Sequence, residues 1–331
     1  MELFLFKHQE YERLYNCTNL VIDSIPIENR RLTIEALINL ILGVIYFLLY
    51  LPCLYSIWKQ HWKNDCYTIL LYIGIVDLGW NRDVFCSYPT LIYIVGTFVN
   101  CFWVAETSAD LVLAFNRCIQ IISPSIAKFL FKGMRTYIWL LFCTLYALYC
   151  MFFVNPVLFS GIYFAWFFYP FVGYREDYGE FVFDQLPSYH DVSVAILSPL
   201  IYLIFAIALV IKSKKSIITP NQAPTQYFSI SRLEKMVFLQ VFSLSLLNTT
   251  ECLFYIIMQY TTQQKWMTIL AEFLWQVFLF HIHGFPPIIY LTLNKTIRED
   301  CLILLKKLKN INKDPPSNVV NVMVTPFNAN S

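Results

Sequence analysis

Two acids and an arginine recur at helical spacing inside a long apolar segment. Glu106, Asp110, Leu113 and Arg117 are three or four residues apart, so an α-helix places all four on one face. Ionised groups are costly in hydrocarbon, so such a face normally points into a helix bundle and marks a functional site. The alternatives are a structural polar network for the two acids and a positive anchor at the membrane edge for Arg117.

The composition of the chain requires a lipid environment. Of its 331 residues, 58% are hydrophobic and only 14% are charged, and the chain contains 29 Phe and 22 Tyr residues. A soluble globule could not hide that much apolar surface from water. The sequence therefore predicts an integral membrane protein.

Seven apolar segments predict an all-α, membrane-spanning seven-helix bundle. Six of them can cross about 30 Å of hydrocarbon at about 1.5 Å per residue. The second is unusually short, with 15 residues, or about 22 Å of helix, before Asn81-Arg82-Asp83 interrupts it. The predicted spans are residues 32–57, 66–80, 89–115, 136–156, 192–211, 236–260 and 266–293.

The distribution of positive charge orients this bundle. If all seven segments cross and residues 1–31 are extracellular, 17 of the 24 basic residues fall on the cytoplasmic side, as the positive-inside rule requires. Asn16 heads the glycosylation sequon Asn16-Cys17-Thr18 in this external region. Glycosylation of Asn16 is therefore expected.

The cysteines offer one external disulfide. Most of the ten lie in or beside predicted spans, where small buried apolar residues are common. Only Cys17 and Cys86 fall confidently outside, in the oxidising compartment. They are the natural disulfide pair.

The last span and the segment after it have their own signatures. Pro286 and Pro287 remove backbone donors near the inner end of the span, which indicates either a bending switch or a static kink. Residues 294–309 carry a stripe of apolar residues flanked by lysines, which predicts an amphipathic helix on the inner leaflet. Within it, Cys301 is either palmitoylated or unmodified. Residues 310–331 are polar and are expected to form a disordered cytoplasmic tail.

Signatures of enzymes are absent from the sequence. The chain has no glycine-rich phosphate loop, no HExxH motif and no nucleophile elbow. His281 and His283 lie near Glu272 but lack a metal-ligand framework. No catalytic residue, cofactor, metal site or nucleic-acid partner is expected.

A series of short sequence strings occurs in order along the chain. They are Tyr15 to Thr18, Leu51 to Leu54, Gly74 to Asp77, Phe85 to Tyr93, Asn116 to Cys118, Leu130 to Thr136, Ala165 to Phe168, His283 to Pro286 and Tyr290 to Arg298. Together they resemble the nematode serpentine receptors of class T. The Phe-Cys-Ser-Tyr-Pro and terminal Tyr-Leu-Thr-Leu-Asn strings make the resemblance specific.

The resemblance implies a rhodopsin-like, chemosensory G-protein-coupled receptor. Asn116 and Arg117 then occupy the place of the aspartate-arginine-tyrosine motif that meets a heterotrimeric G protein. Pro286 to Tyr290 takes the place of the proline-to-tyrosine switch, and Asp77 that of the sodium-binding acid of the second span. The sequence departs from the family where only Leu78 to Val84 separate two of the strings, which indicates either a wrong exon boundary or a truncated helix.

The leading hypothesis is a receptor in the plasma membrane. The membrane of a sensory cilium is one such location. An external small molecule or peptide would favour a state that is open to the G protein. By depth in the bundle, the candidate ligand wall comprises Trp103, Glu106, Trp275 and Gln276. The alternatives are an ion-coupled transporter that uses the intramembrane acids and a receptor-like protein that no longer signals because its second helix is truncated.

Overall fold

The computed structural model describes the two ends of the bundle and most of its helices. Described are residues 1–17, 33–62, 65–76, 89–163, 165–174, 184–218 and 285–311, and single helical residues or short runs between 236 and 270. Asp77, Cys86, Trp275, Gln276 and nearly all of the tail 310–331 lie outside the described residues.

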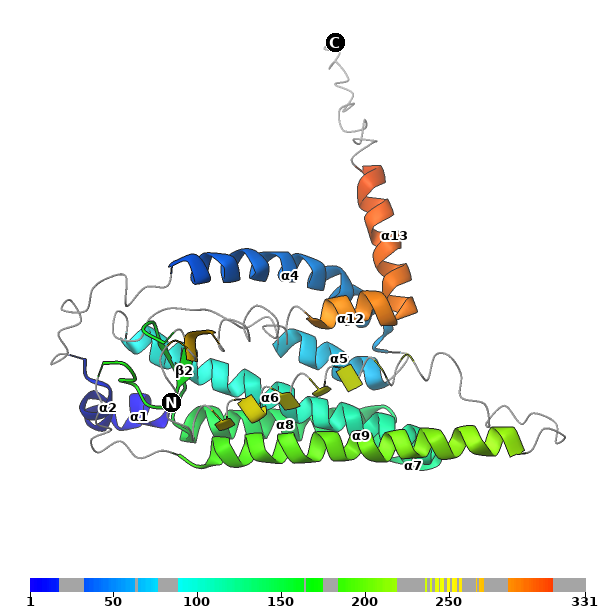
Figure 1. Cartoon of the computed structure of the whole chain (residues 1–331), viewed down its shortest axis with the longest axis horizontal. Helices are drawn as coiled ribbons and strands as arrows, with labels where there is room; N and C mark the ends of the chain where they lie inside the picture. The colour runs from blue at the N-terminus through cyan, green and yellow to red at the C-terminus, as the bar shows by residue number, and fades with distance from the viewer. Residues whose placement is uncertain are drawn as a thin grey trace, which may run out of the picture.

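Within these residues, four helices are long and apolar enough to cross a bilayer. They are α4 (Thr33–Gln60), α6 (Pro89–Ile122), α8 (Met134–Phe153) and α9 (Leu186–Ile218). All four run along the long axis of the molecule (Figure 1). Their apolar outer surfaces, for example Phe142 at 64% exposure, suit contact with lipid tails rather than water.

Helix α6 is the centre of the bundle, because it packs against α5 (Asp65–Val76), α8 and α9. Ala109, Leu113 and Ala114 on α6 are completely buried in a cluster that also holds residues of α4, α5 and α12 (Phe285–Leu293). Small side chains such as these alanines let membrane helices approach closely. This cluster forms the inner half of the core.

The end of the bundle that is predicted to be external, called the outer end below, carries a cap that the all-α prediction did not contain. Strands β1 (Leu158–Ser160) and β2 (Ala165–Phe167) pair antiparallel with Phe159 opposite Trp166. The short helices α1 (Glu2–Phe6) and α2 (His8–Tyr15) lie at the same end (Figure 1).

Aromatic packing fastens this cap to α6. The rings of Tyr11 and Tyr15 each contact the ring of Tyr93 edge-on, with centroids 4.9 Å apart. Both tyrosines are nearly fully buried. The all-α prediction did not include these two short strands, although helices make up most of the described chain, as predicted.

A further helix covers the opposite end of α8. Helix α7 (Pro124–Phe131) begins with a proline, whose fixed φ and missing N–H suit a first helical turn. Trp139 donates its indole N–H to the Leu130 carbonyl at 3.2 Å. Its ring stacks on Phe131 with centroids 5.7 Å apart. Trp139 therefore positions α7 against the start of α8.

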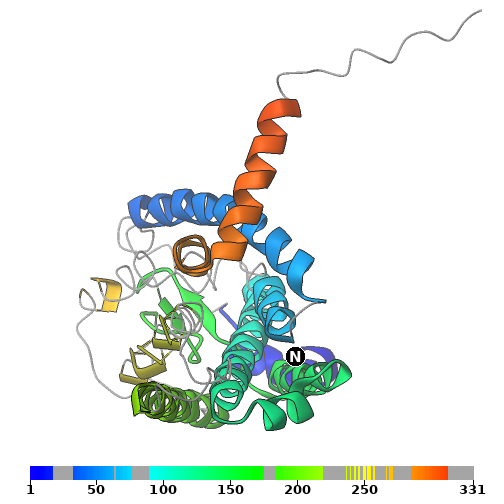
Figure 2. The same cartoon turned by 90° about the vertical axis from the view of Figure 1, so that its right-hand side faces the viewer.

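The predicted amphipathic helix is present as α13 (Lys295–Ile311). Asn294 caps its start, since Asn294 Oδ1 accepts the Ile297 N–H at 3.2 Å. Arg298 Nη1 donates to the Leu291 and Thr292 carbonyls at the end of α12, at 3.3 Å and 2.9 Å. These bonds fix a sharp bend, and α13 leaves the bundle steeply inclined to its long axis (Figures 1 and 2), as a helix lying along a membrane surface would.

One carboxylate ties α13 to the first membrane helix. Asp300 accepts hydrogen bonds from Ser56 at 2.9 Å, Lys59 at 2.6 Å and Gln60 at 3.1 Å, all at the end of α4. Burial alone would raise the pKa of Asp300, but these hydrogen bonds and the Lys59 charge outweigh burial and lower its pKa.

Cys301 is buried beside this carboxylate. It is only 3% exposed and lies in the same buried cluster as Cys53 of α4. Acylation requires an exposed thiol, so this packing does not support palmitoylation of Cys301.

Replacing Asp300 with alanine is expected to lower the free energy of unfolding by about 2 kcal/mol, because three donors lose their charged acceptor. The contribution of Asp300 is present above the ordinary aspartate pKa of about 3.9 and is lost as pH falls through the lowered value. Thermal unfolding of the purified protein at pH 7 measures the effect. Glu299→Ala is the control, because Glu299 pairs only with Lys295 in solvent. Equal losses in the two variants would contradict the anchoring role.

Candidate functional site

A buried polar cluster lies between α6, α8 and α9 in the outer half of the bundle. The Trp103 indole N–H donates to Asp191 Oδ1 at 3.0 Å. Next to Asp191, the Nε2 atom of His190 is hydrogen-bonded to the Thr107 hydroxyl at 2.8 Å. The Tyr146 hydroxyl lies 3.4 Å from Nδ1 of the same ring. Asp191 and His190 are 4% and 8% exposed, so these bonds replace contacts with water.

The sequence prediction missed Asp191 and His190. The predicted fifth span began at residue 192, because two polar residues directly before an apolar run resemble the end of a loop. The helix instead begins at Leu186, which carries both side chains into the bundle. A signal was present in the sequence, since an acid one turn inside a helix that faces other helices requires a buried donor.

Glu106 and Asp110 lie on α6, as predicted. Glu106 is only 3% exposed, as expected of an inward-facing acid, whereas Asp110 is only partly buried; their functional role stays a prediction. The ligand-wall candidate Trp103 is on the same helix and belongs to the polar cluster through Asp191. The other wall candidates, Trp275 and Gln276, lie outside the described residues.

At the inner end of α6, Arg117 begins a chain of side-chain hydrogen bonds that continues through two amides. Its Nη1 donates to Gln120 Oε1 at 3.1 Å, and Gln120 Nε2 donates to Asn116 Oδ1 at 2.9 Å. Asn116 is completely buried. Among the described residues, Arg117 has no ion pair and its buried Nε has no hydrogen-bond partner. A guanidinium in this position retains donors for a carboxylate or carbonyl of another molecule.

The described part of the last span is α12. Pro286 is the second residue of α12 as described, and the residues directly before Phe285 lie outside the described part of the chain. Tyr290 is completely buried and packs in the same cluster as Leu113 and Cys118 of α6. The predicted switch tyrosine therefore lies in the same buried cluster as residues of the helix that carries Arg117.

Of the residues predicted to be external, Asn16 and Cys17 lie at the capped end. Asn16 is exposed directly after α2. Cys17 is disulfide-bonded, whereas all seven other cysteines whose side chains are described are free. Because Cys86 lies outside the described residues, the pairing of Cys17 with Cys86 stays a prediction.

Replacing Asp191 with alanine is expected to lower the free energy of unfolding by about 1–3 kcal/mol, because the Trp103 N–H is left buried without an acceptor. Asp191→Asn keeps a carbonyl oxygen there and is expected to cost clearly less. Thermal unfolding of both variants in detergent measures these losses, with the exposure of the buried thiols as the signal of unfolding. Indistinguishable losses would show that the hydrogen bond to Trp103 does not stabilise the bundle.

Comparison with known proteins assigns this architecture to a family. The family model for the serpentine type 7TM GPCR chemoreceptor Srt matches residues 1–314. The serpentine receptor class T-55 of Caenorhabditis elegans is 24% identical over 260 residues, which cover 75% of this chain and 67% of the relative. The chain, a multi-pass membrane protein built of apolar helices, therefore belongs to the Srt family of serpentine seven-transmembrane chemoreceptors.

Proposed function

We propose that the protein is a chemosensory receptor of the plasma membrane. The membrane of a sensory cilium is one such location. An external small molecule or peptide binds among the outer halves of its helices and promotes activation of a heterotrimeric G protein at the inner end. The observation that carries the proposal is that one helix, α6, bears polar groups for both steps: Trp103 and Glu106 near the cap, and Arg117 near the other end.

The outer site combines an aromatic surface with hydrogen-bonding groups. Trp103 presents a large ring that is held by Asp191, and Glu106 lies one turn further along α6 on the same side. Trp275 and Gln276 of the last span are proposed to complete the wall. A mostly apolar site with a few placed polar groups is typical of small-ligand recognition.

The inner site combines Arg117 with a basic surface. Lys128, Lys132 and Arg135 lie on or beside α7 and are exposed. Helix α7 lies at the end of the molecule opposite the strands (Figure 1). Trp103 and Arg117 are separated by fourteen residues of continuous helix, or about 21 Å. A rotation or shift of α6 would therefore move both groups together, which is the kind of rigid coupling that switching requires.

Reconstitution with a G protein tests this function. The full chain is placed in lipid nanodiscs with heterotrimeric G proteins of each major class, and nucleotide exchange is compared with that on empty discs. Receptor-dependent exchange by at least one class is expected. Failure with every class, together with a proton flux in liposomes that is driven by an imposed gradient, would favour the transporter hypothesis.

The orientation of the receptor gives a further prediction. Asn16→Gln is expected to abolish the increase in electrophoretic mobility that glycosidase treatment causes, because Asn16 is exposed and is proposed to lie on the external side. Thr296→Ala destroys the sequon at Asn294 without altering the Asn294 side chain, which caps α13. This control should leave the shift intact. If only Thr296→Ala lost the shift, Asn294 would be the glycosylated residue, and the topology would be the inverse of the one proposed.

A further inference from the structure

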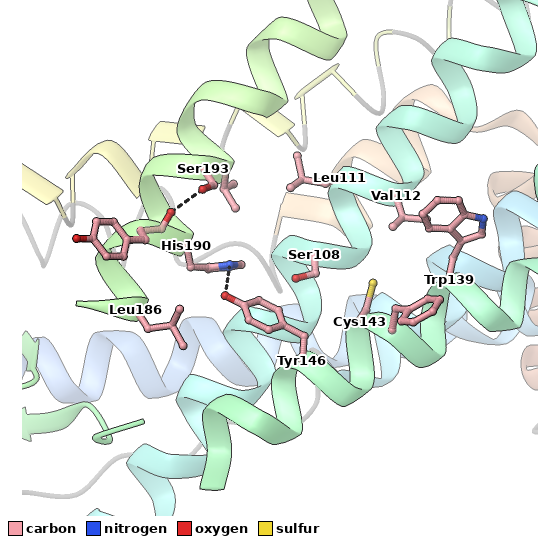
Figure 3. Close-up of a pocket in the computed structure, with 12 residues that line it drawn as sticks. Ser108, Leu111, Val112, Trp139, Cys143, Tyr146, Leu186, His190 and Ser193 are labelled. Carbon is pink, nitrogen blue, oxygen red and sulfur yellow. Dashed lines mark hydrogen bonds between the residues drawn. The ribbon is translucent and has the colours of Figure 1, made fainter. Parts of the chain in front are cut away.

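A cavity opens on the outer surface of the bundle, between α8 and α9, with α6 as its floor. Its volume is about 530 Å³, which is within the range of small-molecule sites. Figure 3 shows side chains from the three helices around a common space, among them Ser108 and Val112 of α6, Trp139 and Tyr146 of α8, and His190 of α9.

One end of this cavity has an unused hydroxyl group. Serines and threonines in membrane helices usually bond the carbonyl four residues earlier, as Thr107, Thr144 and Ser193 do here at 2.6–2.8 Å. Ser108 makes no hydrogen bond to any described residue. Its hydroxyl points toward the space that His190 and Tyr146 border (Figure 3).

The absence of a hydrogen-bond partner matters more for this hydroxyl group in a membrane than it would in water. Ser108 is partly buried, and a hydroxyl without a partner costs free energy where no water can reach it. The nearby contact between Tyr146 and His190 is also long, at 3.4 Å, beyond the usual range for an O–H···N bond. This end of the cavity can therefore accept one more hydrogen-bonding group.

The other end is apolar and elongated. Trp139 and Tyr146 are separated by two turns of α8, or about 10 Å. Between them the wall consists of Phe142, Cys143 and Val112. No residue that lines the cavity is an acid, a lysine or an arginine, so an ionised ligand would have no counter-charge.

The cavity faces the lipid rather than the outer site. Phe142 and Tyr189 on its two rims are 64% and 66% exposed and lie on the bilayer-facing sides of α8 and α9. Asp191, next to His190 in the chain, is turned instead toward Trp103. A ligand therefore reaches the cavity by partitioning into the bilayer first.

We propose that this cavity is a second ligand site, for a neutral amphiphile with one hydrogen-bonding head group and an apolar body of about ten carbons, such as a medium-chain alcohol. The head group bonds the Ser108 hydroxyl beside His190. The apolar body lies along α8 to Trp139, the residue that also holds α7 through the Leu130 carbonyl. A bound ligand would thus contact Trp139, the side chain that positions α7, which is proposed to be cytoplasmic.

Photoaffinity labelling tests the site directly, without any signalling readout. The full chain in nanodiscs is irradiated with a decanol analogue that carries a diazirine, and the labelled peptides are identified by mass spectrometry. Labels are expected on α8 and α9 around Phe142 and Tyr189. Decan-1-ol should displace the probe better than decane, because decane has no head group.

Two serine variants separate a built site from general lipid contact. Ser108→Ala is expected to weaken displacement by decan-1-ol about fivefold, which corresponds to one neutral hydrogen bond. Ser193→Ala is the matched control, since its hydroxyl lines the same cavity but already bonds the Tyr189 carbonyl. Equal displacement in both variants, equal competition by decane, or labels spread evenly over α4 would overturn the proposal.

Discussion

Replacing Arg117 with alanine is expected to lower receptor-dependent nucleotide exchange about thirtyfold. The guanidinium is held by one amide and has no ion pair among the described residues, so its remaining donors can bond a G-protein segment. Removing one member of a desolvated charged contact typically costs about 2 kcal/mol or more, which is about thirtyfold in affinity. Nucleotide exchange in nanodiscs, with a G protein that responds to the unmodified receptor, measures the effect.

The control for this prediction is Arg13→Ala. Arg13 is an exposed arginine on α2 that pairs with Glu10 at 3.8 Å, at the capped end and away from the proposed inner site, so its removal should leave exchange unchanged. Thermal unfolding of both variants checks that the bundle is intact. Unchanged exchange in Arg117→Ala, with a folded receptor, would show that α6 does not contact the G protein through this residue.

The described membrane helices were predictable because apolar length alone reports them. The predicted ends were less accurate for a physical reason. The third span was ended at residue 115 because Asn116 and Arg117 are polar, yet α6 continues to Ile122, since Gln120 bonds both side chains along the helix surface. Hydropathy reports where lipid contact ends, whereas backbone hydrogen bonding decides where a helix ends.

The outer cap could not be predicted from local patterns. Its strands have only three residues each, which is too short for alternation to be recognised. Their position depends on contacts between distant parts of the chain, such as Tyr11 and Tyr15 on Tyr93. The N-terminal helices α1 and α2 are fixed by the same contacts.

Among the polar residues of the bundle, too, some features follow from the local sequence and others depend on contacts between helices. Helical spacing predicted that Glu106 and Asp110 share a face of α6, because the period of a helix is a property of the sequence, and the structure shows Glu106 buried and Asp110 partly buried. The bond between Trp103 and Asp191 joins two helices, so no periodicity within one segment reveals it. Ser108 is likewise informative only because the structure shows that it lacks the usual carbonyl partner.

Replacing Gly96 with alanine is expected to destabilise the outer half of the receptor by about 3 kcal/mol. A Cβ atom at Gly96 would lie 1.8 Å from the backbone carbonyl oxygen of Val157, directly before β1. Backbone atoms cannot rotate away as a side chain would, so α6 and the strand segment must separate. Thermal unfolding should shift by several degrees, and protease cleavage between β1 and β2 should accelerate.

Gly43→Ala provides the matched control for this substitution. Gly43 lies within α4 and has no atom within 4 Å of the position of an added Cβ. Alanine is the better helix former by about 0.5–1 kcal/mol, so this variant should be as stable as the unmodified protein or slightly more stable. If both glycine variants unfolded at the same temperature, the close contact between α6 and Val157 would not be what holds the cap on the bundle.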